Sequence, residues 1–192
     1  MKNLLTIAMI VILGMPGLCH AENPKVLIET ELGDIIAEIY TEKAPVTSSN
    51  FMRYIGDKLY DGTNFFRVVT KEESSPNPGV PIEVIQGGQV EKAKQFPPIE
   101  HETTEMTGLK HLNGALSMAR YRPGTAASSF SIIINDQPEM DFGGKRQPDG
   151  QGFAVFGYVV SGMEIARKIH QQPRERQSLK PPIRIISIRL IS

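Results

Sequence analysis

The sequence NFFRVV at residues 64–69 and the sequence IEVIQGGQ at residues 82–89 decide the fold of this chain. Both segments are rich in β-branched and aromatic residues and are bounded by Gly, Pro and Asp, which is typical of strands. A polar loop with three prolines, residues 71–81, lies between them. Two strands joined by such a loop can place Arg67 and Gln86 side by side, so we predict that this pair is the centre of the functional site.

Residues 1–21 have the pattern of a secretory signal peptide. Lys2 gives a short positive start, an apolar run follows at residues 4–13, and the segment ends in the small residue Ala21. The run is too short for a membrane-spanning helix. Lipid attachment at Cys19 is the alternative, which we disfavour because bulky Leu18 precedes the cysteine. We therefore expect an exported protein, located in the periplasm or, alternatively, fully secreted.

The remaining residues, 22–192, suit one domain with a full core. The one cysteine lies in the leader, so we expect no disulfide and no thiol chemistry. The chain has 21 basic and 21 acidic residues, and this balance gives no field to attract nucleic acid or an anionic membrane. No second apolar run could span a bilayer. We expect a monomer, because nothing in the sequence marks a symmetric interface.

We also predict neither a metal site nor a cofactor. His101, His111 and His170 are scattered, and His101-Glu102 lacks the second histidine of a zinc motif. The glycine pairs at residues 87–88 and 143–144 do not fit a phosphate loop.

About eight short strands and two helices are predicted along the chain. A hairpin covers residues 26–40 with its turn at Gly33, and a helix begins at Pro45, which suits a first helical turn. Val46, Phe51, Tyr54 and Ile55 lie close to helical spacing and give this helix one apolar face. Residues 90–108 are expected to be irregular. The further strands are expected at 64–69, 82–89, 114–119, 128–134, 153–160 and 183–191, and the second helix at 162–170. This spacing favours an all-β barrel or sandwich. In the last strand Ile186, Ile188 and Leu190 alternate with Ser187 and Arg189, so we expect the three apolar residues on one face, and a phase slip at Ile185-Ile186 indicates a bulge.

In this order the segments resemble the cyclophilin family of peptidyl-prolyl cis-trans isomerases. The similarity covers residues 26–190, and its motifs are the Ala44-Pro45 and Asn50-Phe51 pairs, YDGTNFFRV at 60–68, VIQGG at 84–88, LSMAR at 116–120, SSFSI at 128–132, VFG at 155–157 and VSGM at 160–163. Each motif alone is weak, but their order is specific. The resemblance implies an all-β fold with two helices, built as a closed eight-stranded antiparallel β-barrel. It implies rotation about X–Pro bonds in proline-containing polypeptide clients, and for an exported member, help in folding exported proteins.

The implied chemistry needs a hydrogen-bond donor rather than a nucleophile. Rotation about the X–Pro bond breaks no bond but has a barrier of ~18–20 kcal/mol from amide resonance. In the twisted state the prolyl nitrogen regains a lone pair, and a permanently charged guanidinium can donate to it. The resemblance assigns this role to Arg67, with Gln86 orienting it and holding the substrate backbone.

The resemblance also implies a set of substrate-binding residues. Its members are Phe66, Val84, Ala119, Arg120, Ser129, Phe130, Ser131, Met140 and Phe153. The apolar members would hold the proline ring, and the backbone of Arg120 would bind the peptide.

The chain departs from the family pattern mainly at the proline pocket. Glu83 and Ser131 stand where the family has aromatic residues, Glu139 where it has a tryptophan, and Phe66 and Phe153 where it has histidines. We therefore keep a second hypothesis, a module that binds proline-containing peptides with little turnover. Glu83 and Glu139 either face solvent or, as the sharper hypothesis, one of them pairs with Arg67 and weakens catalysis.

Overall fold

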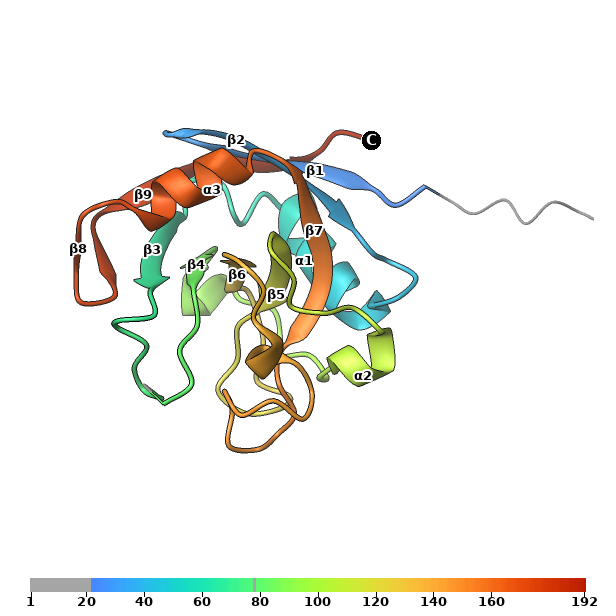
Figure 1. Ribbon diagram of the computed structural model, residues 1–192. Helices are drawn as coiled ribbons and strands as arrows, with labels where there is room; N and C mark the ends of the chain where they lie inside the picture. The colour runs from blue at the N-terminus through green and yellow to red at the C-terminus, as the bar shows by residue number, and fades with distance from the viewer. Residues whose placement is uncertain (1–21, 78) are drawn as a thin grey trace, which may run out of the picture.

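The computed structural model of the chain describes residues 22–77 and 79–192 (Figure 1). The predicted signal peptide, residues 1–21, lies outside the described residues. Across the two described ranges, no helix has both the length and the apolar character needed to cross a membrane.

The described residues form one antiparallel sheet that closes on itself. Its strands are β1 (Lys25–Thr30), β2 (Gly33–Ile39), β3 (Asn64–Val69), β4 (Val84–Gly87), β5 (Ala115–Met118), β6 (Phe130–Ile133), β7 (Ala154–Ser161), β8 (Arg174–Glu175) and β9 (Ser178–Leu190). The order is β1-β2-β7-β5-β6-β4-β3-β9, and β1 also pairs with β9. The predicted closed eight-stranded antiparallel barrel is thereby confirmed, and the two-residue strand β8 only extends β9 as a hairpin.

In residues 22–77 and 79–192, three α-helices and two short 3₁₀ turns accompany the strands. They are α1 (Pro45–Gly56), α2 (Thr104–Thr107), α3 (Met163–His170), η1 (Lys92–Lys94) and η2 (Pro138–Met140). The two predicted helices are α1 and α3, whereas α2 and η1 lie in a segment that we expected to be irregular. Thr103 caps α2 at its start and Gly108 ends it in a left-handed conformation. These caps stabilise a helix of four residues, which is too short for hydrophobic periodicity to predict.

Helix α1 packs on the barrel through aromatic contacts and receives its cap from a distant residue. The Phe51 ring lies 5.3 Å from Phe130 and 5.0 Å from Phe156, measured between centroids. The N-cap residue has no side-chain cap, and instead the buried Glu102 accepts hydrogen bonds from the N–H groups of Val46 (3.0 Å) and Thr47 (2.7 Å). Val46 itself is 38% exposed, so its predicted place on the buried face is wrong.

The last strand contains the predicted bulge and is longer than predicted. Glu29 pairs with Ser187 but Thr30 pairs with Ile185, so Ile186 is the extra residue. The slip turns Ile183, Ile185 and Ile188 inward and leaves Ile186 and Leu190 about half exposed, against our prediction that Ile186, Ile188 and Leu190 share one face. The strand starts at Ser178 rather than at residue 183, and this extension reaches β3 beside Arg67.

Candidate active site around Arg67

A bulge in β3 separates Arg67 from the core. Phe65 is fully buried, and two residues further along a regular strand a side chain would face the same way. The register against β4 shifts between Phe65 and Arg67, and such a shift re-aims the following side chain. Arg67 then pairs directly with Gln86 across the ladder, which confirms that the two residues lie side by side.

The Arg67 guanidinium is held by two side-chain amides. Its Nη1 donates to Gln86 Oε1 at 2.9 Å, and its Nε and Nη2 donate to Gln177 Oε1 at 2.9 and 2.7 Å. Nη2 also lies 3.5 Å from the carbonyl oxygen of Ser75 in the β3–β4 loop. Burial lowers the pKa of Arg67, although a guanidinium stays charged at neutral pH.

Two hollows share Phe66, the neighbour of Arg67 in the chain. The first, of about 490 Å³, is lined by Phe66, Arg67, Glu73, Ser75, Arg176, Gln177 and Ser178. The second, of about 790 Å³, shares Phe66 and includes Tyr121, which is 91% exposed. Arg67 therefore borders one of two open hollows from which an extended peptide could approach.

The predicted substrate-binding residues divide into two groups. Phe66, Ala119, Ser129 and Phe153 are partly exposed, whereas Val84, Arg120, Phe130, Ser131 and Met140 are buried. The strands and loops do bring several of them together: the Ala119 N–H donates to the Ser129 carbonyl, and the Phe153 N–H to the Met140 carbonyl. Val84, Ser131 and Met140 are only 3%, 8% and 3% exposed, so a proline ring can touch them only after neighbouring groups move.

The β3–β4 loop is folded around an arginine from another part of the chain. Arg146 is 6% exposed, and its Nη1 reaches the carbonyl oxygens of Ser74 (2.9 Å), Asn77 (2.8 Å) and Val80 (2.8 Å). Its Nη2 donates to the Ser75 carbonyl at 3.2 Å. Burial and the nearby positive charge of Arg67 lower the pKa of Arg146. Arg146 therefore holds the described residues of this loop beside the hollow that Glu73 and Ser75 help to line.

A second buried arginine holds the loop that carries Arg146. Arg120 makes a bidentate ion pair with Asp149, at 2.7 and 2.9 Å, and its Nε donates to the Gly152 carbonyl at 2.8 Å. The side chain of Arg120 is thus used inside the protein. Only its backbone is left for the peptide contact that the resemblance implies.

The two glutamates of the altered pocket have other partners. Glu83 forms an ion pair with Lys71 at 3.3 Å and accepts a hydrogen bond from Asn135, while Glu139 accepts one from the Lys145 N–H. The hypothesis that one of them pairs with Arg67 is therefore wrong within residues 22–77 and 79–192. The charge of Arg67 faces amides and a carbonyl instead of a carboxylate.

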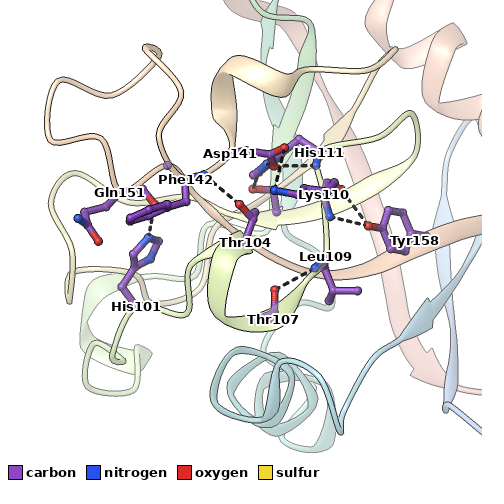
Figure 2. A network of polar contacts seen from close by, with 12 residues as sticks. His101, Thr104, Thr107, Leu109, Lys110, His111, Asp141, Phe142, Gln151 and Tyr158 are labelled. Carbon is purple, nitrogen blue, oxygen red and sulfur yellow. Dashed lines mark hydrogen bonds and ion pairs between the residues drawn. The ribbon is translucent and has the colours of Figure 1, made fainter.

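The sequence did not reveal a buried Ser–His–Asp arrangement, whose His111 and Asp141 appear in Figure 2. His111 Nδ1 lies 2.7 Å from Asp141 Oδ1, and its Nε2 lies 2.9 Å from Ser117 Oγ. Burial lowers the pKa of His111; burial alone would raise that of Asp141, but hydrogen bonds from His111 lower it overall. His111 and Ser117 are each 1% exposed, so no substrate reaches the hydroxyl and the arrangement is structural.

The same network ties two connecting segments together. The Phe142 N–H donates to Thr104 Oγ1, and the ring of His101 contacts the Gln151 carbonyl, as Figure 2 shows. Nowhere in the described ranges do three or more His, Cys, Asp or Glu side chains gather in a group that could hold a metal.

Comparison with known proteins gives one consistent result. The family described as "Cyclophilin type peptidyl-prolyl cis-trans isomerase/CLD" matches residues 25–190. A peptidyl-prolyl cis-trans isomerase of Acinetobacter baylyi is 34% identical over 95% of this chain and 94% of its own length. Peptidyl-prolyl cis-trans isomerase A of Dickeya dadantii is 36% identical over 83% of this chain and 78% of its own length.

Solved structures show the same fold. A cyclophilin-type isomerase of Cryptosporidium parvum superposes with a TM-score of 0.67 at 21% identity, covering 88% of this chain and 98% of its own. A second structure of that protein, in the presence of the dipeptide Ala-Pro, gives a TM-score of 0.65 at 22% identity and covers 88% of this chain and 99% of its own.

Proposed function

The chain belongs to the cyclophilin-type peptidyl-prolyl cis-trans isomerase family, and from this premise we propose that Arg67 is the residue that catalyses rotation about X–Pro bonds. The observation that carries the proposal is the setting of its guanidinium. The group lines an open hollow, and its partners within the described ranges are two amides and a carbonyl. Its charge is therefore not neutralised by a carboxylate and can act on the pyramidal prolyl nitrogen.

The reduction of the rotation barrier that catalysis requires is larger than the hydrogen bond from Arg67 can supply alone. An acceleration of five decades means lowering the barrier by about 7 kcal/mol. One hydrogen bond to a charged group contributes about 1.5–3 kcal/mol. The remainder must come from holding the ring and the flanking peptide in a partly dry groove. Gln86 contributes by fixing the orientation of Arg67 and by holding the substrate backbone.

The substrate class is a peptide with an X–Pro bond. Support comes from the related structure, which was determined in the presence of Ala-Pro. We assign the first contacts with the peptide to the partly exposed members of the predicted set, Phe66, Ala119, Ser129 and Phe153. Val84, Ser131 and Met140 would join them once the ring has entered.

The clients and the cellular site are also part of the proposal. Residues 1–21 have the composition of a secretory leader, which supports an exported monomer that assists the folding of exported proteins in the periplasm. Cell fractionation of a strain that expresses the full chain tests the location. Recovery only in the cytoplasm would contradict it, and sedimentation of the purified protein tests the monomer.

Replacing Arg67 tests the catalytic assignment. We expect Arg67→Ala to lower kcat/KM for a short X–Pro peptide by more than about tenfold, because at least one charged hydrogen bond is lost. The exchange of the two isomers is measured by NMR, and thermal unfolding shows that the variant is folded. Arg122→Ala is the matched control, since Arg122 is exposed. An Arg67→Ala enzyme with the wild-type rate would refute the assignment.

The closed state of the predicted pocket favours a second candidate function. Because Val84, Ser131 and Met140 are almost fully buried, the chain could grip an extended peptide without seating the ring. Such a module would bind proline-containing peptides, yet isomer exchange in its presence would be no faster than in buffer. A titration combined with the exchange measurement on one peptide separates the two functions.

A further inference from the structure

A second glutamine, Gln177, accepts more hydrogen bonds from the guanidinium of Arg67 than Gln86 does. The single oxygen Gln177 Oε1 accepts from both Nε, at 2.9 Å, and Nη2, at 2.7 Å. Gln86 accepts one hydrogen bond, from Nη1. The two amides thus hold the guanidinium from two sides, and this fixes its plane.

The short β8–β9 hairpin places Gln177 against β3. Arg174 pairs with Leu179 and Glu175 with Ser178, which leaves residues 176–177 as the turn. Arg176 adopts a left-handed φ of 54° in this turn. The carbonyl of Gln177 accepts a hydrogen bond from the Val68 N–H at 2.8 Å. The backbone beside the side chain is therefore tied to the strand that carries Arg67.

The amide of Gln177 has only one orientation that satisfies its neighbours. Its Nε2 lies 2.6 Å from the Glu73 carbonyl and 3.2 Å from the Ser75 carbonyl. Carbonyl oxygens accept hydrogen bonds and guanidinium N–H groups donate them, so the NH₂ must face the loop and the oxygen must face Arg67. The side chain is held at both ends before any substrate binds.

We propose that Gln177 is a positioning residue for the isomerase reaction, which holds the guanidinium of Arg67 in its working orientation without neutralising its charge. This inference rests on the proposed catalytic function of Arg67. A carboxylate at the same place would also orient the group, but it would form an ion pair and compete with the prolyl nitrogen. An amide supplies the geometry alone.

The donor inventory supports this role. A guanidinium has five N–H groups, and the described residues accept hydrogen bonds from four of them. The fifth belongs to Nη1, the atom that also donates to Gln86. Gln177 accepts from Nε and from one N–H of Nη2, so the donor left for a substrate belongs to Nη1. Gln177 also lines the hollow of about 490 Å³ together with Arg67.

Two substitutions in the full chain test the proposal. Gln177→Met keeps the volume but removes both hydrogen bonds to Arg67 and both from Nε2 to the loop. We expect kcat to fall by about three- to tenfold with KM changed less than about twofold, because Gln86 still holds Nη1 and only part of the orientation of Arg67 is lost. Gln177→Glu keeps an acceptor but adds a charge, and we expect a larger fall in kcat than for Gln177→Met. Gln171→Met and Gln171→Glu are the controls, because Gln171 is exposed at the end of α3.

A spectroscopic readout separates positioning from a structural role. We expect the Arg67 Nε–H to exchange faster with solvent by NMR in Gln177→Met and to be unchanged in Gln171→Met. Wild-type kcat in both Gln177 variants, or a loss that matches only the unfolded fraction, would overturn the proposal. If Gln177→Glu fails to fold, Gln177→Met and the Nε–H exchange decide. If Arg67→Ala is active, the proposed function fails; if it is inactive while both Gln177 variants are unimpaired, only this inference fails.

Discussion

Removing Arg146 should release the β3–β4 loop from the site. Five hydrogen bonds run from Arg146 to this loop, to the Ser74 carbonyl and hydroxyl and to the carbonyls of Ser75, Asn77 and Val80. Four of them share the two N–H groups of Nη1, so they do not add independently. In Arg146→Ala the exposed carbonyls regain water, which offsets part of the loss.

The expected magnitude follows from this count. Hydrogen bonds to a charged group contribute about 1.5–3 kcal/mol each, and the desolvation cost of the buried guanidinium offsets part of this stabilisation. We expect the free energy of local loop opening to fall by about 2–4 kcal/mol, which multiplies the population of the open loop by about thirty to several hundred. Arg146→Lys keeps the charge but offers one nitrogen, so we expect an intermediate effect.

Amide hydrogen exchange measures loop opening directly. The Val80 N–H donates to the Asn77 carbonyl, and the Ile82 N–H to Ser74 Oγ, so both amides report on the loop. In Arg146→Ala they should exchange faster, whereas the amides of β5 and β7 should keep their rates. Arg122→Ala is the matched control. Wild-type exchange at residues 80 and 82 in Arg146→Ala would refute the view that this guanidinium holds the loop.

Two further predictions concern stability. Glu102→Ala should lower the free energy of unfolding by about 1–2 kcal/mol, the usual value of a helix cap, because the N–H groups of Val46 and Thr47 lose their carboxylate; a urea midpoint equal to that of the wild type would contradict this. Burial lowers the pKa of His111 in the folded state, so the unfolded chain binds more protons between that value and about 6.5, and stability should decline as the pH falls through this window. His111→Asn should flatten, but not abolish, this decline in urea titrations between pH 7.5 and 5, because burial also lowers the pKa of His101; an unchanged slope would contradict the assignment.

The sequence was sufficient where the signal is local. Runs of β-branched and aromatic residues bounded by turn residues located the strands, and the phase slip at Ile185-Ile186 located the bulge that the register confirms. Arg67 and Gln86 lie on strands whose pattern could be recognised, and the ladder brings them together. Helix α2 was missed because four residues are too few to show a period, and Val46 was misplaced because one apolar residue at a helix start need not face the core.

Contacts between distant loops could not be predicted. Gln177 is 110 positions from Arg67, and Arg146 is 72 positions from Ser74, so no spacing or motif links either pair. Both contacts depend on the paths of irregular connections, which hydrophobic periodicity does not describe. The burial of Ser131 and Met140 has the same origin, since it depends on how the neighbouring segments close over them.

The β3–β4 loop and the loop that carries Arg146 hold each other in place, and this has a consequence for protein engineering and for the evolution of the chain. Carbonyl oxygens of the β3–β4 loop accept hydrogen bonds from Arg146, which belongs to the loop between η2 and β7. Arg120 anchors that second loop through its ion pair with Asp149. Grafting residues 71–81 alone into another protein of this fold would leave those carbonyl oxygens without the guanidinium of Arg146. Deleting residues 71–81 here would leave Arg146 without these acceptors. The two segments are therefore expected to be gained, lost and transplanted together, as a single inherited module.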